Sequence, residues 1–313
     1  MPPPRDPERH GGGRGVLSAR AALALAAGLA WTAVASAAPA VLAVSSSVGT
    51  APAPRRVVAL APSAAEILFA LGAAGRVVAV SDFAASLPEA AGKTRVGGFT
   101  PDVERVVALA PDLVVVSRDG TDRAAYDRLV ALRLPILVTS GRTLEGVFED
   151  VLSVGRAIGE EPRALALVAS LRSRVTAAVE AGRGARRGRP LPSAAVLIWP
   201  DPPIVAGPAS FVGDLLRVAG IPNAAPPSAG EWPRVTLETV AAWNPGVLVR
   251  PETKENAAAF ARGLSDPRWR LVPAAAKGRV LTLPGDWLER PGPRLVDALE
   301  SLLSRLSAPG FLP

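Results

Sequence analysis

Short apolar runs rich in β-branched residues alternate along this chain with segments of helical character. Such runs are typical of strands buried on both faces, because a strand with one face in water would alternate apolar and polar residues. Their alternation with helices predicts parallel sheets that are covered on both sides. The expected strands are 55–62, 76–82, 113–117, 136–140, 194–199, 247–250 and 280–284, and the expected helices include 102–110, 122–133 and 210–220.

One phrase occurs twice, which indicates a duplicated architecture. The chain contains DVERVVALAPDLVVV in its first half and TLETVAAWNPGVLV in its second. Glu104 precedes Pro111 by seven positions, and Glu238 precedes Pro245 by the same spacing. A helix, a proline turn and an apolar strand are expected in succession at both places. We therefore expect an α/β fold with two parallel-sheet lobes.

A long amphipathic segment between the two halves predicts one helix that joins the lobes. It runs from Glu161 to Gly182, with Pro162 suited to the first helical turn and Gly182 to the end. One long helix restricts hinge motion more than several extended crossings would, so we expect little domain closure. The stripe expected to face the lobes is Leu165, Val168, Leu171, Val175 and Val179.

These patterns divide the chain into an N-terminal lobe at 55–160, the joining helix at 161–182 and a C-terminal lobe at 183–313. Ligand-binding loops of such lobes lie beyond the carboxyl ends of the strands, so a cleft is expected between the lobes. Within the first expected helix, Ser63 and Glu66 have the spacing of a capping box, in which Ser63 accepts a hydrogen bond from the amide of Glu66.

The first 37 residues have the features of an export signal. Four arginines make the front basic, an Ala/Leu run follows, and Ala35-Ser36-Ala37 supplies the small residues that a signal peptidase needs. Cleavage after Ala37 would leave 38–54 as a flexible tether. The alternative is an uncleaved membrane anchor over 21–44, which is long enough to span a membrane but is interrupted and mostly alanine. The absence of Cys excludes a lipid-modified N-terminal Cys, which favours a free protein in a periplasm.

Several kinds of chemistry are excluded by what the chain lacks. It has no Cys, and its single His, His10, lies in the signal segment. The mature chain therefore lacks the imidazole of a Ser-His-Asp triad, a thiol nucleophile and the main zinc ligands. Phosphate-loop and nucleophile-elbow motifs are absent, and no close acidic pair points to carboxylate catalysis. The arginine-rich run at 182–190 is interpreted as a solvated loop and not as a nucleic-acid surface. The chain is therefore not expected to be an enzyme.

Three stretches and the joining helix carry a resemblance to a known family. The stretches are RVVALAPSAAEILFALGAAGRVVAVSDF, VGGFTPDVERVVALAPDLVVV and DWLERPGPRLVDALE. From about Arg55 to Leu306, the chain resembles the class III, or helical-backbone, periplasmic binding proteins of ABC importers. The resemblance implies a monomeric carrier without a cofactor, which delivers cobalamin, haem or a ferric siderophore to a membrane permease and its ATPase.

The resemblance gives the repeated phrase a second meaning. In that family one surface Glu on each lobe pairs with Arg residues of the permease, and the matching positions here are Glu104 and Glu238. The alternative is that each Glu only favours the first turn of its helix through the helix dipole. A ligand-sensing module that docks on a receptor is not separated from a carrier by the sequence, so both stay open.

The same resemblance implies which segments line the cleft. Trp232 and Trp287 lie in Pro/Gly-rich stretches and favour a binding role, whereas Trp243 and Trp269 are assigned to the core. Arg294 has the alternative role of opening the last helix, 294–306, and pairing with Asp297. For Trp199 a role in core packing stays open beside a role in binding. The expected ligand-binding residues are Phe83, Phe99, Trp199, Gly207, Trp232, Asp286, Trp287, Arg290 and Arg294.

Cobalamin is the favoured ligand. Haem iron usually takes an axial His, Tyr, Cys or Met, and after cleavage only Tyr126, in an expected helix, is left. Cobalamin brings its own lower axial base and needs a broad apolar cleft with a few donors. Anionic ferric siderophores are the main alternative, because Arg290 and Arg294 could serve them. The segment DFAASLP lacks the tyrosines that cobalamin-type members often carry, so the choice between the two ligands stays open.

Overall fold

The computed structural model describes residues 52–254, 256–308 and 310–311. All of them belong to one compact unit of the chain, Leu42–Pro313. The expected signal segment, 1–37, and most of the expected tether, 38–54, lie outside the described residues. Within the described part, no helix is both long enough and apolar enough to cross a membrane.

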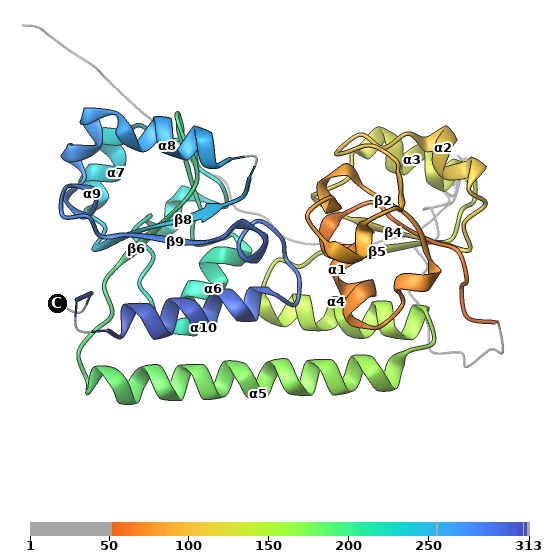
Figure 1. The fold of residues 1–313 in the computed structure, drawn as a ribbon, viewed down its shortest axis with the longest axis horizontal. Coiled ribbons are helices and arrows are strands. Elements are labelled where there is room, and N and C mark those ends of the chain that lie inside the picture. The colour runs from red at the N-terminus through yellow and green to blue at the C-terminus, as the bar shows by residue number, and fades with distance from the viewer. Residues whose placement is uncertain (1–51, 255, 309, 312–313) are drawn as a thin grey trace, which may run out of the picture. The chain divides into compact units, whose positions relative to one another are not determined.

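The first half of the chain forms a parallel sheet of five strands in the order β3-β2-β1-β4-β5 (Figure 1). Every adjacent pair is parallel, as the continuous apolar runs predict. The predicted order of strands and helices is confirmed here, with ends that differ by a few residues. The elements are β1 (Val57–Ala59), α1 (Pro62–Ala70), β2 (Val77–Val80), β3 (Thr94–Arg95), α2 (Val103–Ala108), β4 (Leu113–Ser117), α3 (Arg123–Ala131), β5 (Ile136–Thr139) and α4 (Leu144–Ala157).

The second half forms a four-stranded sheet in the order β7-β6-β8-β9. It is not purely parallel, because β7 returns beside β6 as an antiparallel hairpin arm, which the sequence pattern did not indicate. Helix α6 ends at Gly220 in a left-handed conformation, as predicted. The elements are β6 (Ala194–Pro200), β7 (Pro203–Val205), α6 (Phe211–Ala219), α7 (Leu237–Trp243), β8 (Val247–Glu252), α8 (Ala257–Ser265), α9 (Pro273–Ala276), β9 (Val280–Pro284) and α10 (Leu295–Leu306).

The repeated phrase folds in the same way in both halves. Asp102 and Thr236 are the N-caps of α2 and α7, and each side-chain oxygen accepts a hydrogen bond from the backbone N–H three residues later. Each helix is followed by a residue with positive φ directly before the proline, Ala110 at 43° and Asn244 at 47°. A parallel strand follows, β4 in one lobe and β8 in the other. The predicted duplication is therefore visible at the level of single turns.

The predicted capping box at the start of α1 is wrong. The helix begins at Pro62, with Ala61 at the N-cap position and no side-chain hydrogen bond there. A proline suits the first position of a helix, since its missing N–H would have no partner there anyway. Ser63 and Glu66 therefore lie inside the helix, and the Glu66 side chain is buried instead of reaching back to a free amide.

Helix α5 (Glu161–Arg186) joins the lobes and is longer than predicted. Gly182 does not end it but is buried within it, where an added Cβ would lie 3.3 Å from Leu303 of α10. The absence of a side chain lets the two helices approach closely. The helix ends at Arg186 and is followed by its C-cap Arg187, which has a φ of 48°, so 183–186 of the arginine-rich run are helical and not a loop.

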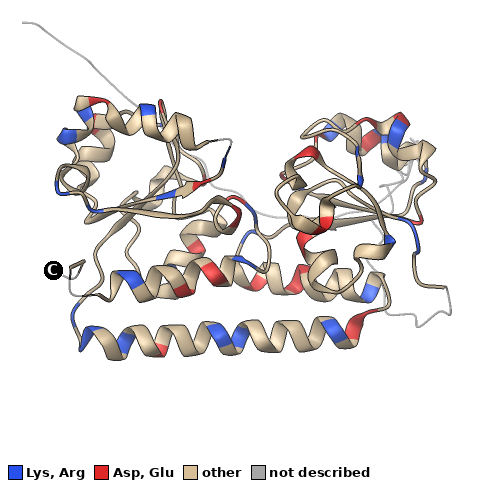
Figure 2. Ribbon diagram, viewed as in Figure 1, with Lys and Arg blue, Asp and Glu red and all other residues tan. Residues whose placement is uncertain are grey.

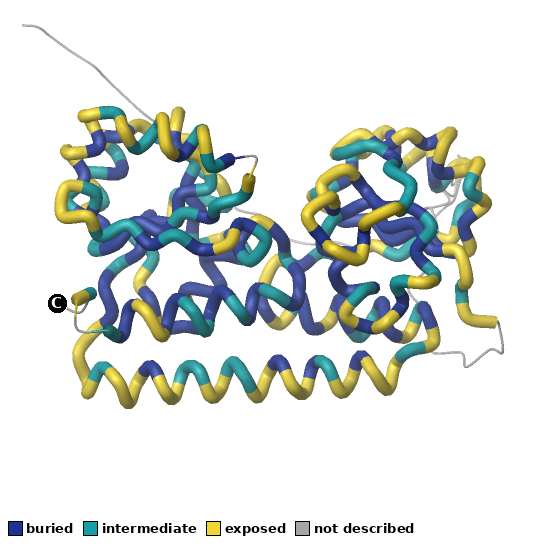
Figure 3. Tube along the Cα trace, viewed as in Figure 1, coloured by how far each residue is buried: buried dark blue, intermediate teal, exposed yellow. Residues whose placement is uncertain are grey.

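The predicted stripe of α5 is confirmed except at its first residue. Val168 and Leu171 are buried, and Val175 and Val179 pack against the hydrophobic core. Leu165 is 55% exposed, whereas Ala164 is fully buried. Starting from Ala164, the helical repeat brings Val168 and Leu171 to the same face, and it turns Leu165 about 100° away, given 3.6 residues per turn. Figure 3 shows the exposed side of α5 turned away from the rest of the described structure. The large apolar residue misled the sequence interpretation, because a small alanine makes the contact.

Helix α5 is held to α10 by charge as well as by packing. Figure 2 shows acidic and basic residues close together on these two helices. The Arg174 guanidinium lies 2.6 Å from carboxylate oxygens of both Asp297 and Glu300. Both helices also contact each other extensively.

The two lobes share one hydrophobic cluster. Its members come from α1 and α4 of the first lobe and from α6 and α10 of the second, with Ile67, Val151, Leu215 and Leu299 all at 0% exposure. Helix α4 contacts α6 directly, so α5 is not the only connection between the lobes. Opening a hinge between them would expose part of this cluster to water, which is unfavourable. The shared cluster supports the expectation of little domain closure.

Candidate functional site

A cavity of about 530 Å³ is lined by loops from both lobes. In the first lobe these loops follow strands β1 to β5. In the second lobe they follow β7, β8 and β9, and one further loop, between α6 and α7, also contributes. Ligands of open parallel sheets bind at this edge, outside the carboxyl ends of the strands. The cleft predicted between the lobes is thus present, with the shared hydrophobic cluster below it.

One part of the cavity is an aromatic surface. The side chains of Phe83, Phe99 and Trp232 are 58%, 52% and 38% exposed, although large apolar groups are usually covered. Phe211 supports Trp232, with ring centroids 5.3 Å apart in an edge-to-face arrangement. Gly98 lies behind Phe83, and an added Cβ there would come within 3.0 Å of the phenyl ring. The aromatic rings are placed to cover a large apolar ligand.

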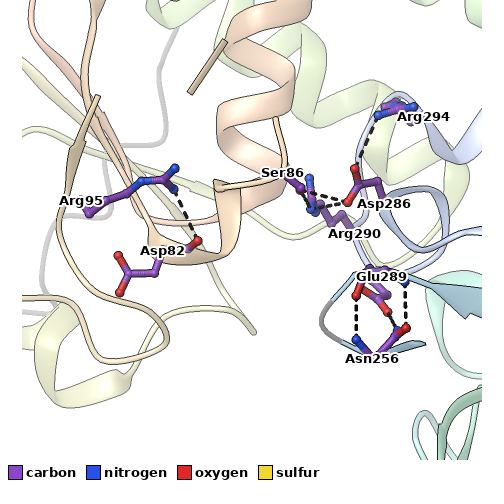
Figure 4. Close-up of polar contacts among 9 residues, drawn as sticks. Asp82, Ser86, Arg95, Asn256, Asp286, Glu289, Arg290 and Arg294 are labelled. Atoms are coloured by element: carbon purple, nitrogen blue, oxygen red, sulfur yellow. Dashed lines mark hydrogen bonds and ion pairs between the residues drawn. The ribbon is translucent and has the colours of Figure 1, made fainter. Parts of the chain in front are cut away.

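The floor of the cavity is a polar contact between the lobes (Figure 4). The Arg290 Nη2 donates to Asp286 Oδ1 and to Ser86 Oγ, and Ser86 Oγ lies 3.1 Å from the same carboxylate oxygen. Arg290 is only 6% exposed, and its Nη1 is buried without a hydrogen-bond partner among the described residues. Its guanidinium is therefore committed mainly to holding the second lobe against Ser86 of the first.

A buried carboxyl group lies beneath this floor. Oε1 of Glu66, in α1, accepts a hydrogen bond of 2.8 Å from the backbone N–H of Arg294, at the start of α10. Burial raises the pKa of Glu66 to about 7, against the lowering effects of that hydrogen bond and of the Arg290 and Arg294 charges. Gly292 passes so close that an added Cβ would lie 2.7 Å from the carboxylate. This contact again joins the two lobes.

A chain of exposed charges crosses the rim of the cavity. The Arg142 Nη1 lies 3.3 Å from Glu231 Oε1 of the opposite lobe, and the Arg142 Nε lies 3.7 Å from Asp119 Oδ2 of its own lobe. Arg142 follows β5 through Gly141, whose N–H donates to Asp150 at 2.8 Å. Burial raises the pKa of Asp150 to about 6. All three rim residues line the cavity.

Several residues expected at the cleft are found there. Phe83, Phe99, Trp232, Asp286 and Arg290 line the cavity. Gly207 lies directly behind it, where its N–H donates to the Glu231 carbonyl at 2.8 Å and an added Cβ would clash with the Gly230 carbonyl.

Three expected residues lie elsewhere among the described residues. Trp199 is in a separate groove of about 580 Å³, where its indole N–H donates to the Asp201 carbonyl at 2.9 Å. Trp287 packs against the shared hydrophobic cluster, and the guanidinium of Arg294 lies over its ring. Arg294 is the N-cap residue of α10 and pairs with Asp297 at 3.6 Å, which is the alternative role that the sequence left open.

The assignment of two tryptophans to the core is confirmed. Trp269 is 3% exposed inside the core cluster of the second lobe, and Trp243 packs against that cluster. Tyr126, the only tyrosine of the chain, packs against the core of the first lobe and is not among the cavity-lining residues.

Sequence reasoning missed part of the lining. Arg142 and Asp119 follow directly on the ends of β5 and β4, so the rule that ligands lie at the carboxyl ends of strands could have identified both. Phe211 is the first residue of α6, behind the N-cap Ser210, and no sequence signal separated it from a core residue. Glu231 stands next to Trp232 and reaches the cleft only because the 230–232 loop lies against Gly207.

The charge balance of the lining is acidic. It contains two guanidinium groups, those of Arg142 and Arg290, and five carboxylates, those of Asp82, Asp119, Glu231, Asp286 and Glu289. Glu289 accepts a hydrogen bond of 2.8 Å from the Asn256 amide (Figure 4). Within the described residues, His, Cys, Asp and Glu form no group of three or more that could hold a metal ion.

The two repeated glutamates lie at equivalent places on the surface. Glu104 and Glu238 are each the second residue of their helices, and both side chains are exposed. Figure 1 shows α2 and α7 on the side of the molecule away from α5. Glu104 lies 3.7 Å from Arg128, while hydrogen bonds from the backbone and from Thr236 lower the pKa of Glu238. Both carboxylates are accessible on the surface.

Comparison with protein families gives a match over most of the chain. The family described as periplasmic binding protein matches residues 57–287. A cobalamin-binding protein of Halobacterium salinarum is 31% identical over 254 residues, which cover 79% of this chain and 68% of that protein.

Solved structures of similar fold include proteins named for different ligands. The periplasmic haem-binding protein RhuT from Roseiflexus sp. RS-1 in apo form has a TM-score of 0.70 and 27% identity, covering 81% of this chain and 98% of that one. The periplasmic vitamin B12 binding protein BtuF of Vibrio cholerae has a TM-score of 0.70 and 24% identity, covering 82% of this chain and 98% of that one. At 24% identity, the similarity to the Vibrio cholerae protein shows a shared fold alone.

Proposed function

Because the chain belongs to the periplasmic binding protein family, whose members bind solutes for ABC importers and are not enzymes, we propose that its solute is cobalamin. The single observation that carries this proposal is the lining of the cleft, which combines exposed aromatic rings with an excess of carboxylates. The name of the Halobacterium salinarum relative supports the same ligand.

The carboxylate excess argues against an anionic ferric siderophore. Such a ligand would need several unengaged cations, and the arginines that the sequence offered for it, Arg290 and Arg294, are held in ion pairs with Asp286 and Asp297. Bringing a ligand with several negative charges beside five carboxylates would be repulsive at the short distances of a cleft. The amide side chains of cobalamin, by contrast, are neutral and can donate N–H groups to carboxylate oxygens.

The aromatic surface fits a corrinoid body. The rings of Phe83, Phe99 and Trp232 present apolar faces and edges to the cavity, which suits a large ligand with an apolar macrocycle. A cavity of about 530 Å³ lies in the range that encloses drug-sized ligands, so a corrinoid would fill it and extend out of its open side.

Haem is the second ligand named among the similar structures, and the lining gives it less support. The protein groups that usually ligate haem iron are His, Tyr, Cys and Met. The lining contains none of them, and Tyr126 is packed elsewhere. Haem binding here would require ligation by a group outside this usual set.

The decisive experiment is titration of the mature chain, beginning at Ala38, with cyanocobalamin. Tryptophan fluorescence and heat are recorded, with haemin and a ferric catecholate as competitors. Saturable one-to-one binding that neither competitor displaces is expected. Saturable binding of haemin or of the catecholate, with none of cyanocobalamin, would overturn the ligand assignment and leave the carrier function standing.

Docking and location belong to the same proposal. We place the contact with the permease at Glu104 and Glu238, one on each lobe, and the carrier in the periplasm as a monomer after cleavage behind Ala37. The equivalent positions and exposure of the two carboxylates support this docking role. We also propose the division of the chain into one lobe at 55–160 and a second at 183–313, with 161–182 as the joining segment.

A further inference from the structure

Arg142 and Glu231 face each other across the cleft from different lobes. The Arg142 Nη1 to Glu231 Oε1 distance is 3.3 Å, and Asp119 lies on the other side of the guanidinium at 3.7 Å from Nε. The side chains of Arg142 and Glu231 are 47% and 37% exposed. Two carboxylates therefore hold one accessible cation at the mouth of the cavity.

The backbones behind this pair are fixed, so only the side chains have freedom to move. Gly141, with a φ of 47°, lies against Pro291, and its N–H is bound by the carboxylate of Asp150. On the other side, Gly207 donates to the Glu231 carbonyl at 2.8 Å. The backbone positions of Arg142 and Glu231 are therefore set before a ligand binds.

Arg142 is also the accessible cation of the lining. Arg290, the other guanidinium there, is 6% exposed and bound to Asp286 and Ser86. Ion pairs between exposed side chains contribute little to stability, so the contacts of Arg142 with Asp119 and Glu231 can be exchanged at small cost. A guanidinium binds the oxygens of a phosphate through two parallel hydrogen bonds, which are stronger than neutral ones.

We propose that Arg142 is the anion-recognition residue of the cleft, and that it exchanges the carboxylate of Glu231 for a single phosphodiester on an otherwise uncharged ligand. The inference rests on the proposed function, since cobalamin carries one phosphodiester beside neutral amides. In the free protein Glu231 competes with the ligand for Arg142 and keeps the guanidinium at the rim. The carboxylate of Glu231 also repels ligands that carry several negative charges.

The test compares cyanocobalamin with dicyanocobinamide, which keeps the corrin ring but lacks the phosphodiester. Arg142→Gln is expected to lower the affinity for cyanocobalamin at least ~10-fold, as for loss of a charged hydrogen bond, and to change that for dicyanocobinamide less than ~2-fold. Glu231→Gln is expected to raise the cyanocobalamin affinity, because the competitor is removed. Arg118→Gln is the matched control, since Arg118 is exposed at the end of β4 but is not among the lining residues.

The outcomes distinguish failure of the Arg142 role from failure of cobalamin binding. If Arg142→Gln lowers the affinities for both corrinoids equally, Arg142 only holds the two lobes together, and the inference is overturned. Unchanged affinities in Arg142→Gln, with normal binding by the parent protein, would also overturn it while the proposed function stands. If the parent protein binds neither corrinoid, the proposed function fails and the inference with it. Thermal unfolding of each variant verifies that the chain is folded.

Discussion

The carboxylate of Glu66 accepts a hydrogen bond from the backbone N–H of Arg294, 228 residues later in the chain, at 2.8 Å. The contact joins α1 of the first lobe to the first turn of α10 in the second. It stands on the shared hydrophobic cluster and beneath the cavity floor formed by Arg290, Asp286 and Ser86. The same few residues therefore hold the lobes together and shape the bottom of the cleft.

Stability is expected to fall as the pH rises from about 5 to 8. Burial raises the pKa of Glu66 from 4.5 to about 7, so between these values the folded protein holds a proton that the unfolded chain has released. The stabilisation from this proton is complete below about 4.5 and is lost as the pH passes about 7. The loss is on the order of 3 kcal/mol at most, since each pKa unit corresponds to about 1.4 kcal/mol. Asp150, with its pKa raised to about 6, adds a smaller change in the same direction.

Urea unfolding at pH 5 and pH 8 measures this difference. Glu66→Gln, which stays neutral, is expected to lose most of the pH dependence, whereas Glu180→Gln, at an exposed position of α5, is expected to keep it. A parent protein that is more stable at pH 8 than at pH 5 would contradict the raised pKa of Glu66.

Trp232→Ala is expected to weaken corrinoid binding ~10-fold or more and to remove most of the fluorescence quenching, because large aromatic side chains dominate the energy of such contacts. Trp199→Ala serves as the matched control. Trp199 is almost equally exposed, at 39% against 38%, but lies in the separate groove. Loss of binding in Trp199→Ala with retention in Trp232→Ala would mean that the ligand site is not this cavity.

Replacing both Glu104 and Glu238 by Ala is expected to abolish uptake by the intact importer while ligand affinity stays within ~2-fold of the parent value. Both carboxylates are exposed and neither is among the residues that line the cavity, so their loss is expected to leave the cleft intact. Glu145 and Glu180 replaced together by Ala provide the control with the same change of charge. Uptake that persists after replacement of Glu104 and Glu238 would refute the docking role. An equal loss of uptake in the control variant would also refute it.

Two glycines give opposite expectations for stability. Gly207→Ala is expected to cost about 2 kcal/mol or more, because an added Cβ would meet the backbone carbonyl of Gly230, which cannot swing aside like a side-chain tip. Gly184→Ala, in α5 with open space around it, is expected to stabilise the protein by about 0.5–1 kcal/mol. Denaturant midpoints compare the two. Equal midpoints would show that the 230–232 loop is not held tightly against Gly207.

The sequence by itself determined the architecture. Apolar runs long enough for buried strands, proline turns at equal spacing and an amphipathic joining segment are local patterns, and each was sufficient to predict its element. The repeat of Glu104 and Pro111 in Glu238 and Pro245 predicted the duplication, and the structure reproduces it down to the positive φ of the residue before each proline. Where local patterns failed, as with Leu165 and Ala164 on α5, size was mistaken for burial.

Only the tertiary structure decided which polar residues are available to a ligand. In the sequence Arg290, Arg294 and Arg142 are three arginines near strand or helix ends; in the fold the first is buried against Asp286, the second caps α10, and the third stands at the cleft mouth. The partners that make this difference, Glu66, Ser86 and Glu231, lie on other elements or in the other lobe. A side chain's availability depends on contacts between residues far apart in the chain, and no local pattern encodes the distances at which those contacts form.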